Sequence, residues 1–128
     1  MIFMTILVHS YDNTSTGRTD IPIFGQRVAF SAVEERGEGV GVGEFRARRV
    51  DDHYLLDCVM GVIDPRDRSF GREETDTRSY KVLGIMKLSE KTKAKEFLYK
   101  RALSYANDLN KIIGCGVTDL NKKDPKKR

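Results

Sequence analysis

The residues from Ser89 to Gly116 carry the pattern of one long amphipathic helix with a defined beginning and end. Ser89 is a suitable N-cap, Lys111 lies where a cation favours the helix dipole, and Gly114 suits a left-handed C-cap. We therefore predict a helix over residues 90–113. Its apolar stripe has helical spacing, should pack against a sheet, and consists of Ala94, Leu98, Ala102, Tyr105, Leu109 and Ile112.

The chain before this helix alternates between strand patterns and polar loops. Asp51 and Asp52 are expected to form a tight turn between two of the strands. Strands followed by a single helix are typical of an α+β domain, here an antiparallel sheet of about five strands packed on one face by the C-terminal helix. The domain is expected over 1–116, with a flexible basic tail over 117–128. The strand patterns cover residues 2–9, 21–36, 43–50, 53–63 and 80–88.

Four glycines recur at every second position, at Gly37, Gly39, Gly41 and Gly43. In an extended segment they leave one face of the strand bare, so that a helix, another sheet or a ligand can approach closely. A turn with a close-packed strand after it is the interpretation that we favour. A dinucleotide fold is poorly supported, because the spacing is not G-x-G-x-x-G and no helix pattern follows. We expect this strand to lie beside 53–63, a central strand, under the helix.

The net charge of +4 comes from the end of the chain. Residues 122–128, KKDPKKR, hold five basic side chains and one acidic one, so the rest of the chain is close to neutral. A basic tail can hold phosphate backbones or an acidic partner, and it can equally be a solvated terminus. The basic character of the chain is therefore weak evidence for nucleic-acid binding.

The cysteine, histidine and hydropathy patterns exclude several classes of site. Cys58 lies in an apolar strand and Cys115 between two glycines, without a CxxC pair or a Cys/His cluster, so a zinc site of the usual spacing is excluded. His9 and His53 stand alone, and no cofactor is implied. No apolar run approaches the ~20 residues of a membrane span. Because the opening MIFMTILV reads as a strand rather than a signal peptide, a cytoplasmic protein is expected.

A small carboxylate-dependent hydrolase or nuclease is one alternative function. Such an enzyme would use Glu44, Asp57 and Asp64 across a cleft, or two of these carboxylates with Lys81 and a metal ion. Nothing in their spacing requires either arrangement, and no nucleophile motif such as G-x-S-x-G is present. We therefore assign no catalytic or metal-binding residue. Asp57 lies within an apolar strand, where burial without partners would be costly.

A binding module is the function that the arginines favour. Arg46 and Arg48 project from one strand face, and Arg27 approaches them from the preceding strand, which forms a multi-donor surface suited to phosphate. The polar loops at 10–20 and 64–79 add further donors and an aromatic ring that can stack on a base. The predicted ligand-binding residues are Thr16, Arg18, Arg27, Arg46, Arg48, Phe70 and Arg72.

The sequence thus predicts a small non-enzymatic binding protein for a phosphate-bearing ligand, either a nucleotide or nucleic acid. One alternative is that the arginines form a solvated face paired with Glu34, Glu35 and Glu44. Another is a structural or interaction protein that acts through homo-oligomerisation and through loop contacts to another protein. Leu103 falls opposite the apolar stripe of the helix, where it would suit a homodimer contact.

Overall fold

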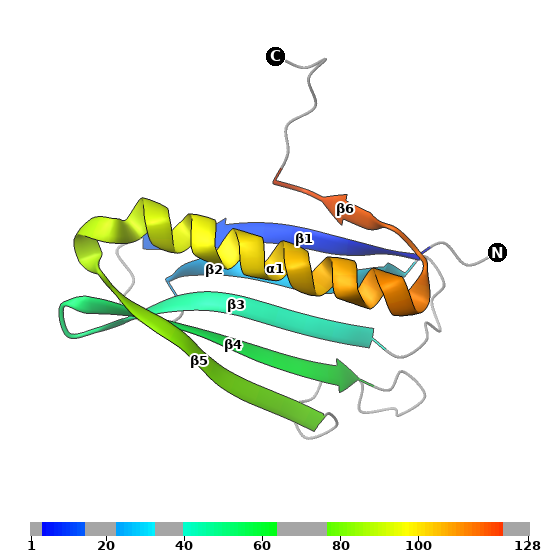
Figure 1. The fold of residues 1–128 in the computed structure, drawn as a ribbon, viewed down its shortest axis with the longest axis horizontal. Helices are drawn as coiled ribbons and strands as arrows, with labels where there is room; N and C mark the ends of the chain where they lie inside the picture. Colours follow the sequence, from blue (N-terminus) through cyan, green and yellow to red (C-terminus); the bar gives the residue numbers. More distant parts are fainter. Residues whose placement is uncertain (1–3, 15–22, 33–39, 64–76, 122–128) are drawn as a thin grey trace, which may run out of the picture.

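The computed structural model describes residues 4–14, 23–32, 40–63 and 77–121, which form one six-stranded sheet and one long helix (Figure 1). This arrangement confirms the predicted α+β class. The strand order is β5-β4-β3-β2-β1-β6, in which β6 is parallel to β1 and the other neighbours are antiparallel. The elements are β1 (Met4–Asp12), β2 (Phe24–Ala32), β3 (Val40–Val50), β4 (His53–Ile63), β5 (Thr77–Lys87), the 3-10 turn η3 (Leu88–Glu90), α1 (Lys91–Ile113) and β6 (Val117–Asp119).

A two-residue turn joins β3 to β4 and sets the register of this hairpin. Val50 pairs with His53, and Asp51 adopts a φ of 55°, a left-handed conformation that aspartate tolerates. The predicted turn at Asp51 and Asp52 is therefore confirmed. From this turn the pairing runs without interruption along both strands.

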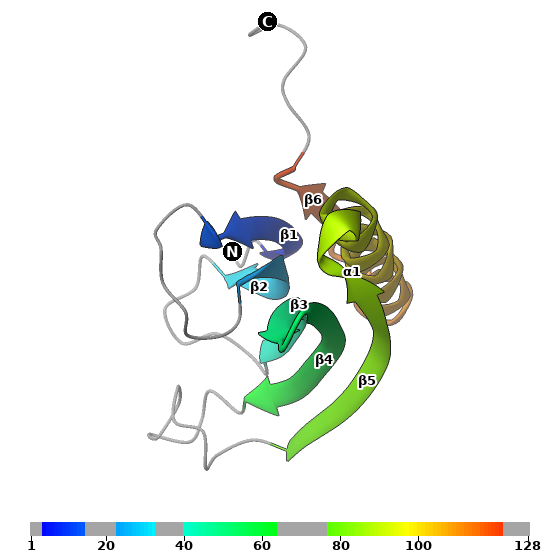
Figure 2. The ribbon, with the colours of Figure 1, turned by 90° about the vertical axis from the view of Figure 1, so that its left-hand side faces the viewer.

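The helix covers one face of the sheet and lies over β1, β2 and β3 (Figure 2). The strands β3 and β4 are neighbours, as expected, but β4 is second from the sheet edge rather than central. Small side chains on α1 allow close packing on this face. The buried core consists of Ile6, Val8, Phe24, Val28, Phe45, Ala47, Tyr54, Leu56, Cys58, Ala94, Leu98, Ala102 and Ala106.

Gly43 allows the helix to approach the sheet. A Cβ added at this position would lie 2.7 Å from Cε2 of Tyr105, so a larger residue would displace the ring from β3. The predicted close packing is therefore confirmed at Gly43. Gly37 and Gly39 lie outside the described residues.

The bounds of the helix agree with the prediction, but three details of it were wrong. The N-cap is Glu90 rather than Ser89, because η3 precedes the helix. Ile112 is 83% exposed, and Leu103 packs partly against the core instead of facing away from it. The buried positions of the helix are spaced four residues apart and end at Ala106. At about 100° per residue, this spacing moves the buried line gradually around the helix, so that Ile112 in the last turn no longer lies on it. The expected C-cap is confirmed at Gly114, with a φ of 74°.

The structure adds a strand in the segment that was predicted as tail. Val117–Asp119 form β6, which pairs with Ile6 to Val8 of β1. The backbone N–H of Leu120 donates to the carbonyl oxygen of Val8 at 2.9 Å, which extends the attachment beyond the strand. The described part of the domain therefore continues to Asn121, and 122–128 lie outside the described residues. No helix in the described ranges has the length and apolar content that a membrane span needs.

Candidate functional site

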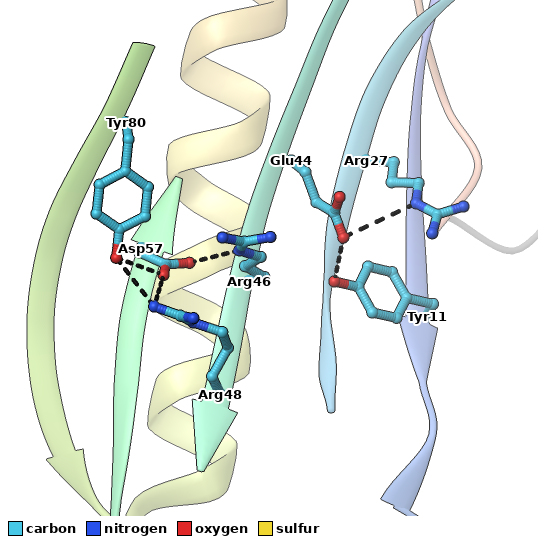
Figure 3. A network of polar contacts seen from close by, with 7 residues as sticks. All are labelled: Tyr11, Arg27, Glu44, Arg46, Arg48, Asp57 and Tyr80. Atoms are coloured by element: carbon cyan, nitrogen blue, oxygen red, sulfur yellow. Dashed lines mark hydrogen bonds and ion pairs between the residues drawn. The ribbon is translucent and has the colours of Figure 1, made fainter. Parts of the chain in front are cut away.

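The sheet face that α1 leaves uncovered carries the polar side chains of β3 (Figure 3). Along this strand Phe45 and Ala47 point towards the helix, so the residues that alternate with them point the other way. The register of β3 and β4 brings their outward side chains together. We call this surface the open face, and the polar residues on it that contact one another are Tyr11, Arg27, Glu44, Arg46, Arg48, Asp57 and Tyr80.

Asp57 lies at the centre of a four-residue network on the open face. Its side chain is 0% exposed, and both of its carboxylate oxygens have partners. Nε of Arg46 donates to Oδ1 at 2.7 Å, and Nη2 of Arg48 lies 2.8 Å from Oδ2. The hydroxyl of Tyr80 donates to the same Oδ2 at 2.8 Å and accepts a hydrogen bond from Nη2 of Arg48 at 3.0 Å. The carboxylate therefore has the partners without which its burial would be costly.

This network places negative charge beneath the surface and positive charge at it. The side chains of Arg46 and Arg48 are 20% and 28% exposed, whereas the Asp57 carboxylate is sealed below them. The Asp57 carboxylate accepts a hydrogen bond from Nε of Arg46. Within the described residues, neither Nη group of Arg46 forms a hydrogen bond. Two guanidinium groups face one carboxylate, so a net positive charge with free donors remains at this point of the sheet.

A second group links β1, β2 and β3 on the same face. The hydroxyl of Tyr11 donates to Oε2 of Glu44 at 2.6 Å, and Nε of Arg27 lies 4.0 Å from that oxygen. Cζ of Arg27 lies 5.1 Å from the centroid of the Tyr11 ring, in cation–π contact. Gly25 makes room for this arrangement, since an added Cβ would lie 3.0 Å from the Tyr11 hydroxyl and 2.4 Å from a backbone oxygen of β3. At 60% exposure, Arg27 is the most accessible of the three arginines.

Burial and hydrogen bonding change the proton affinity of several of these groups. Burial lowers the pKa of Arg46, but the hydrogen bond and charge of Asp57 outweigh it, so the net shift is upward and the guanidinium stays charged. The hydrogen bond to Asp57 raises the pKa of Tyr80. Burial, and then the hydrogen bond to Glu44, raises the pKa of Tyr11 well above its usual value. Both phenols therefore remain protonated donors at neutral pH.

Exposed apolar side chains border the open face along β5. This strand is a sheet edge whose neighbour is β4. Tyr80, Val82 and Ile85 are 52%, 51% and 67% exposed. Val82 pairs with Asp57, and Ile85 pairs with Leu55, so these side chains continue the face that carries the arginines. The open face thus combines cationic, aromatic and aliphatic groups.

The structure brings three of the seven predicted ligand-binding residues together. Arg27, Arg46 and Arg48 share the open face, as their alternation along the strands indicated. Glu44 is a partner of Arg27, but Asp57 is the partner of the other two. The binding role of these arginines stays a prediction. The other predicted residues, and two predicted acidic partners, lie outside the described residues: Thr16, Arg18, Phe70, Arg72, Glu34 and Glu35.

Sequence reasoning considered Asp57 as a catalytic carboxylate and did not place it, Tyr11 or Tyr80 in the binding site. For Asp57 a signal was available, because a two-residue turn at Asp51 and Asp52 places it directly opposite Arg46 in the hairpin. No comparable signal exists for the two tyrosines. Long connections precede β2 and β5, and their length does not fix which residues pair across the sheet.

The catalytic alternative does not retain its proposed arrangement. Lys81 pairs with Cys58 and lines the helix side of the sheet, whereas Asp57 faces the open side. Glu44 and Asp57 do share the open face, but tyrosine and arginine partners engage both carboxylates. Asp64 lies outside the described residues. Within the ranges that the structure describes, no group of three or more His, Cys, Asp or Glu side chains could hold a metal ion.

Comparison of the chain with models of known protein families, with curated proteins and with solved structures finds no match. The functional interpretation therefore depends on the geometry and charge of the open face.

Proposed function

We propose that the protein is a small, non-enzymatic binding protein for single-stranded nucleic acid, which lies across the open face. The distribution of charge on that face carries the proposal. The Asp57 carboxylate is fully buried, while the side chains of the two arginines around it remain partly exposed. Exposed guanidinium groups form charge-assisted hydrogen bonds with phosphate oxygens, and a network that fixes them beforehand reduces the ordering cost of binding.

The shape of the face favours a polymer over a mononucleotide. Proteins usually enclose a small ligand in a concave site, whereas these arginines project from neighbouring strands of a sheet. Tyr80 lies on one side of them, half exposed, with its ring available for stacking. Aromatic rings on a cationic sheet bind successive bases with little sequence preference, at about 1–3 kcal/mol per base.

The cost of the network supports a role beyond stability. A buried group of ions often stabilises a fold no better than apolar residues of the same volume. The four side chains on β3, β4 and β5 nevertheless place two arginines and a tyrosine around one sealed carboxylate. Binding of an anionic chain gives this arrangement a use that an apolar cluster could not provide.

Fluorescence anisotropy with a labelled oligo-dT tests the proposal. Arg27→Ala removes the most exposed arginine of the open face without touching the Asp57 network. Arg101→Ala makes the same charge change on α1, on the other side of the sheet. We expect Arg27→Ala to weaken binding several-fold and to reduce the slope of log affinity against log salt by about 0.7, the value for one phosphate contact to a single strand. Arg101→Ala should do neither. Equal effects of the two variants, or binding that does not depend on salt, would overturn the proposal.

A triple variant separates binding from folding. Arg46→Met, Arg48→Met and Asp57→Leu together replace the charged network with apolar side chains, which often preserves stability. We expect the variant to remain folded by circular dichroism and to lose oligo-dT affinity by about tenfold or more. A folded triple variant that binds as tightly as the unmodified protein would exclude the open face as the binding surface.

A second candidate function is that of an interaction protein that pairs through the edge of β5. The exposed Val82 and Ile85 on this edge strand favour it, because such edges add strands from partners. Light scattering after gel filtration should then show a dimer, and Val82→Lys should yield a monomer. If the two functions use different surfaces, the affinity for oligo-dT should be the same for the dimer and for the Val82→Lys monomer.

A further inference from the structure

A cavity of about 600 Å³ lies between the first half of α1 and the adjoining ends of β1 and β2. This volume falls within the few hundred to about a thousand Å³ that are usual for small-molecule sites. The arginines of the open face do not line it. Its lining comprises Ser10, Tyr11, Asp12, Phe24, Gly25, Gln26, Thr92, Lys95, Glu96, Leu98, Tyr99 and Asn121.

The inner part of the cavity is apolar and aromatic. Phe24 and Leu98 are 1% and 0% exposed and belong to the buried core, and Tyr99 lines the cavity from the next position of the helix. Phe24 and Leu98 therefore close the floor of the cavity, and Lys91 and Lys95 lie over the Phe24 ring. The partly exposed Tyr99, rather than Phe24, is the ring that can contact a flat ligand.

Gln26 supplies one hydrogen-bonding group at this depth. The residue is 6% exposed, and its Oε1 accepts a hydrogen bond from Nδ2 of Asn121 at 3.0 Å. Within the described residues, Nε2 of Gln26 has no hydrogen-bond partner. This nitrogen atom is not sealed from solvent. The amide donor therefore opens to the cavity. Because this donor is open to the cavity, an acceptor on a bound ligand can take the place of water there.

The charged groups around the cavity already have partners. Lys95 and Asp12 form an ion pair, and Lys91 lies 3.3 Å from Oδ2 of the same carboxylate. Glu96 lies 3.7 Å from Nζ of Lys100. The hydroxyl of Tyr99, moreover, donates to Asp119. Charges that are satisfied in this way give an ionic ligand no advantage over a neutral one.

We propose that this cavity binds a small, neutral, planar heterocycle, of the nucleobase or nicotinamide type, whose carbonyl or ring nitrogen accepts a hydrogen bond from Gln26. The ring of Tyr99 contacts one face of the heterocycle, and the Gln26 amide sets its orientation. This proposal does not depend on nucleic-acid binding at the open face, because the site uses Gln26 and none of the three arginines, although Tyr11 borders both sites. Because the ligand is neutral, its affinity does not change with salt, in contrast to the proposed binding of oligo-dT.

Nuclear magnetic resonance titrations with three probes test this site. Uracil and nicotinamide are neutral planar heterocycles with acceptors, and benzoate is a planar anion of similar size. We expect uracil or nicotinamide to shift the side-chain amide signals of Gln26 and the backbone signals of Phe24 and Leu98 in a saturable way, and benzoate to shift them weakly. If neither neutral probe gives saturable shifts at these residues, or if benzoate binds as tightly, the proposal is wrong.

Two variants and a matched control locate the binding. Gln26→Leu removes the donor at nearly constant volume and should weaken the bound heterocycle by about tenfold. If this variant does not fold, Thr92→Trp fills the cavity without touching Gln26 and should abolish the shifts. Lys93→Trp adds the same ring at the neighbouring exposed position and should leave binding unchanged. Binding that survives Thr92→Trp, or that is lost equally in Lys93→Trp, contradicts the site.

The triple variant of the open face should bind the heterocycle with unchanged affinity, which separates the two proposals.

Discussion

The hairpin of β3 and β4 presents two opposite chemistries from the same two strands. Towards α1 it directs apolar side chains such as Leu56, and away from α1 it directs the network around Asp57. Both of these residues are 0% exposed, although only Leu56 belongs to the apolar core on the helix side of the sheet. A sheet face without a covering layer can thus seal a carboxylate, because long guanidinium side chains lie over it. The comparison shows that burial on one face comes from packing and on the other from charge pairing.

The largest expected effect is that of Asp57→Ala on the open face. The change leaves Arg46 and Arg48 close together without their common counter-charge. Removal of one partner from a buried ion pair typically costs about 3–5 kcal/mol, and partial exposure of the arginines places the expected loss near the lower end. Urea unfolding measures this loss. Asp52→Ala, at an 83% exposed position in the turn, should cost less than about 1 kcal/mol, and equal losses would show that the network does not stabilise the fold.

An intermediate effect is expected for Gly43→Ala on the helix-covered face. The new Cβ would lie 2.7 Å from a ring atom of Tyr105, so we expect overpacking to cost about 1–3 kcal/mol. Gly84→Ala is the control, since an added Cβ there meets nothing within 4 Å. Tyr105→Leu should recover part of the loss in the double variant, measured as a coupling energy from urea unfolding. If the losses of unfolding free energy in Gly43→Ala and Tyr105→Leu simply add in the double variant, Gly43 does not govern how closely the helix packs.

The smallest effect is the pH dependence of the Tyr11 hydrogen bond. Folding raises the pKa of Tyr11. The contribution of its hydrogen bond to the free energy of unfolding is therefore fully present below the unfolded pKa of about 10, and it is lost as pH rises through the folded pKa. Tyr11→Phe should therefore lower the free energy of unfolding by about 1 kcal/mol at neutral pH. The difference from the unmodified protein should narrow above about pH 10. A gap that stays constant into the alkaline range would show that the hydroxyl does not donate to Glu44.

Local signals made much of the fold predictable from the sequence. The helix was predicted over 90–113 and is observed over Lys91–Ile113, because its apolar spacing and its glycine C-cap are both read within a few residues. The turn at Asp51 and Asp52 is equally local. By contrast, β6 has three residues and pairs with a strand at the other end of the chain, so no periodic pattern marks it.

The site was predictable only in part, for the same reason. Alternation along single strands placed Arg46 and Arg48 on one face, which needs no knowledge of neighbours. Their partner Asp57 depends on hairpin register, and Tyr80 depends on the pairing of β4 with β5, which shifts by one residue at Leu56/Asp57. A bulge of this kind changes which side chains meet and leaves no clear mark in the sequence.

The pairing of β6 with β1 has a consequence for the order of folding. Thr5 and Gly116, joined by a hydrogen bond, are 111 residues apart, so this contact closes almost the whole described chain. Contacts at such separation form late, since the loop that they close must first be ordered. Until β6 docks, the outer edge of β1 has unpaired backbone groups that another strand can join. The three-residue strand that completes the sheet is thus also the last protection of its edge against association.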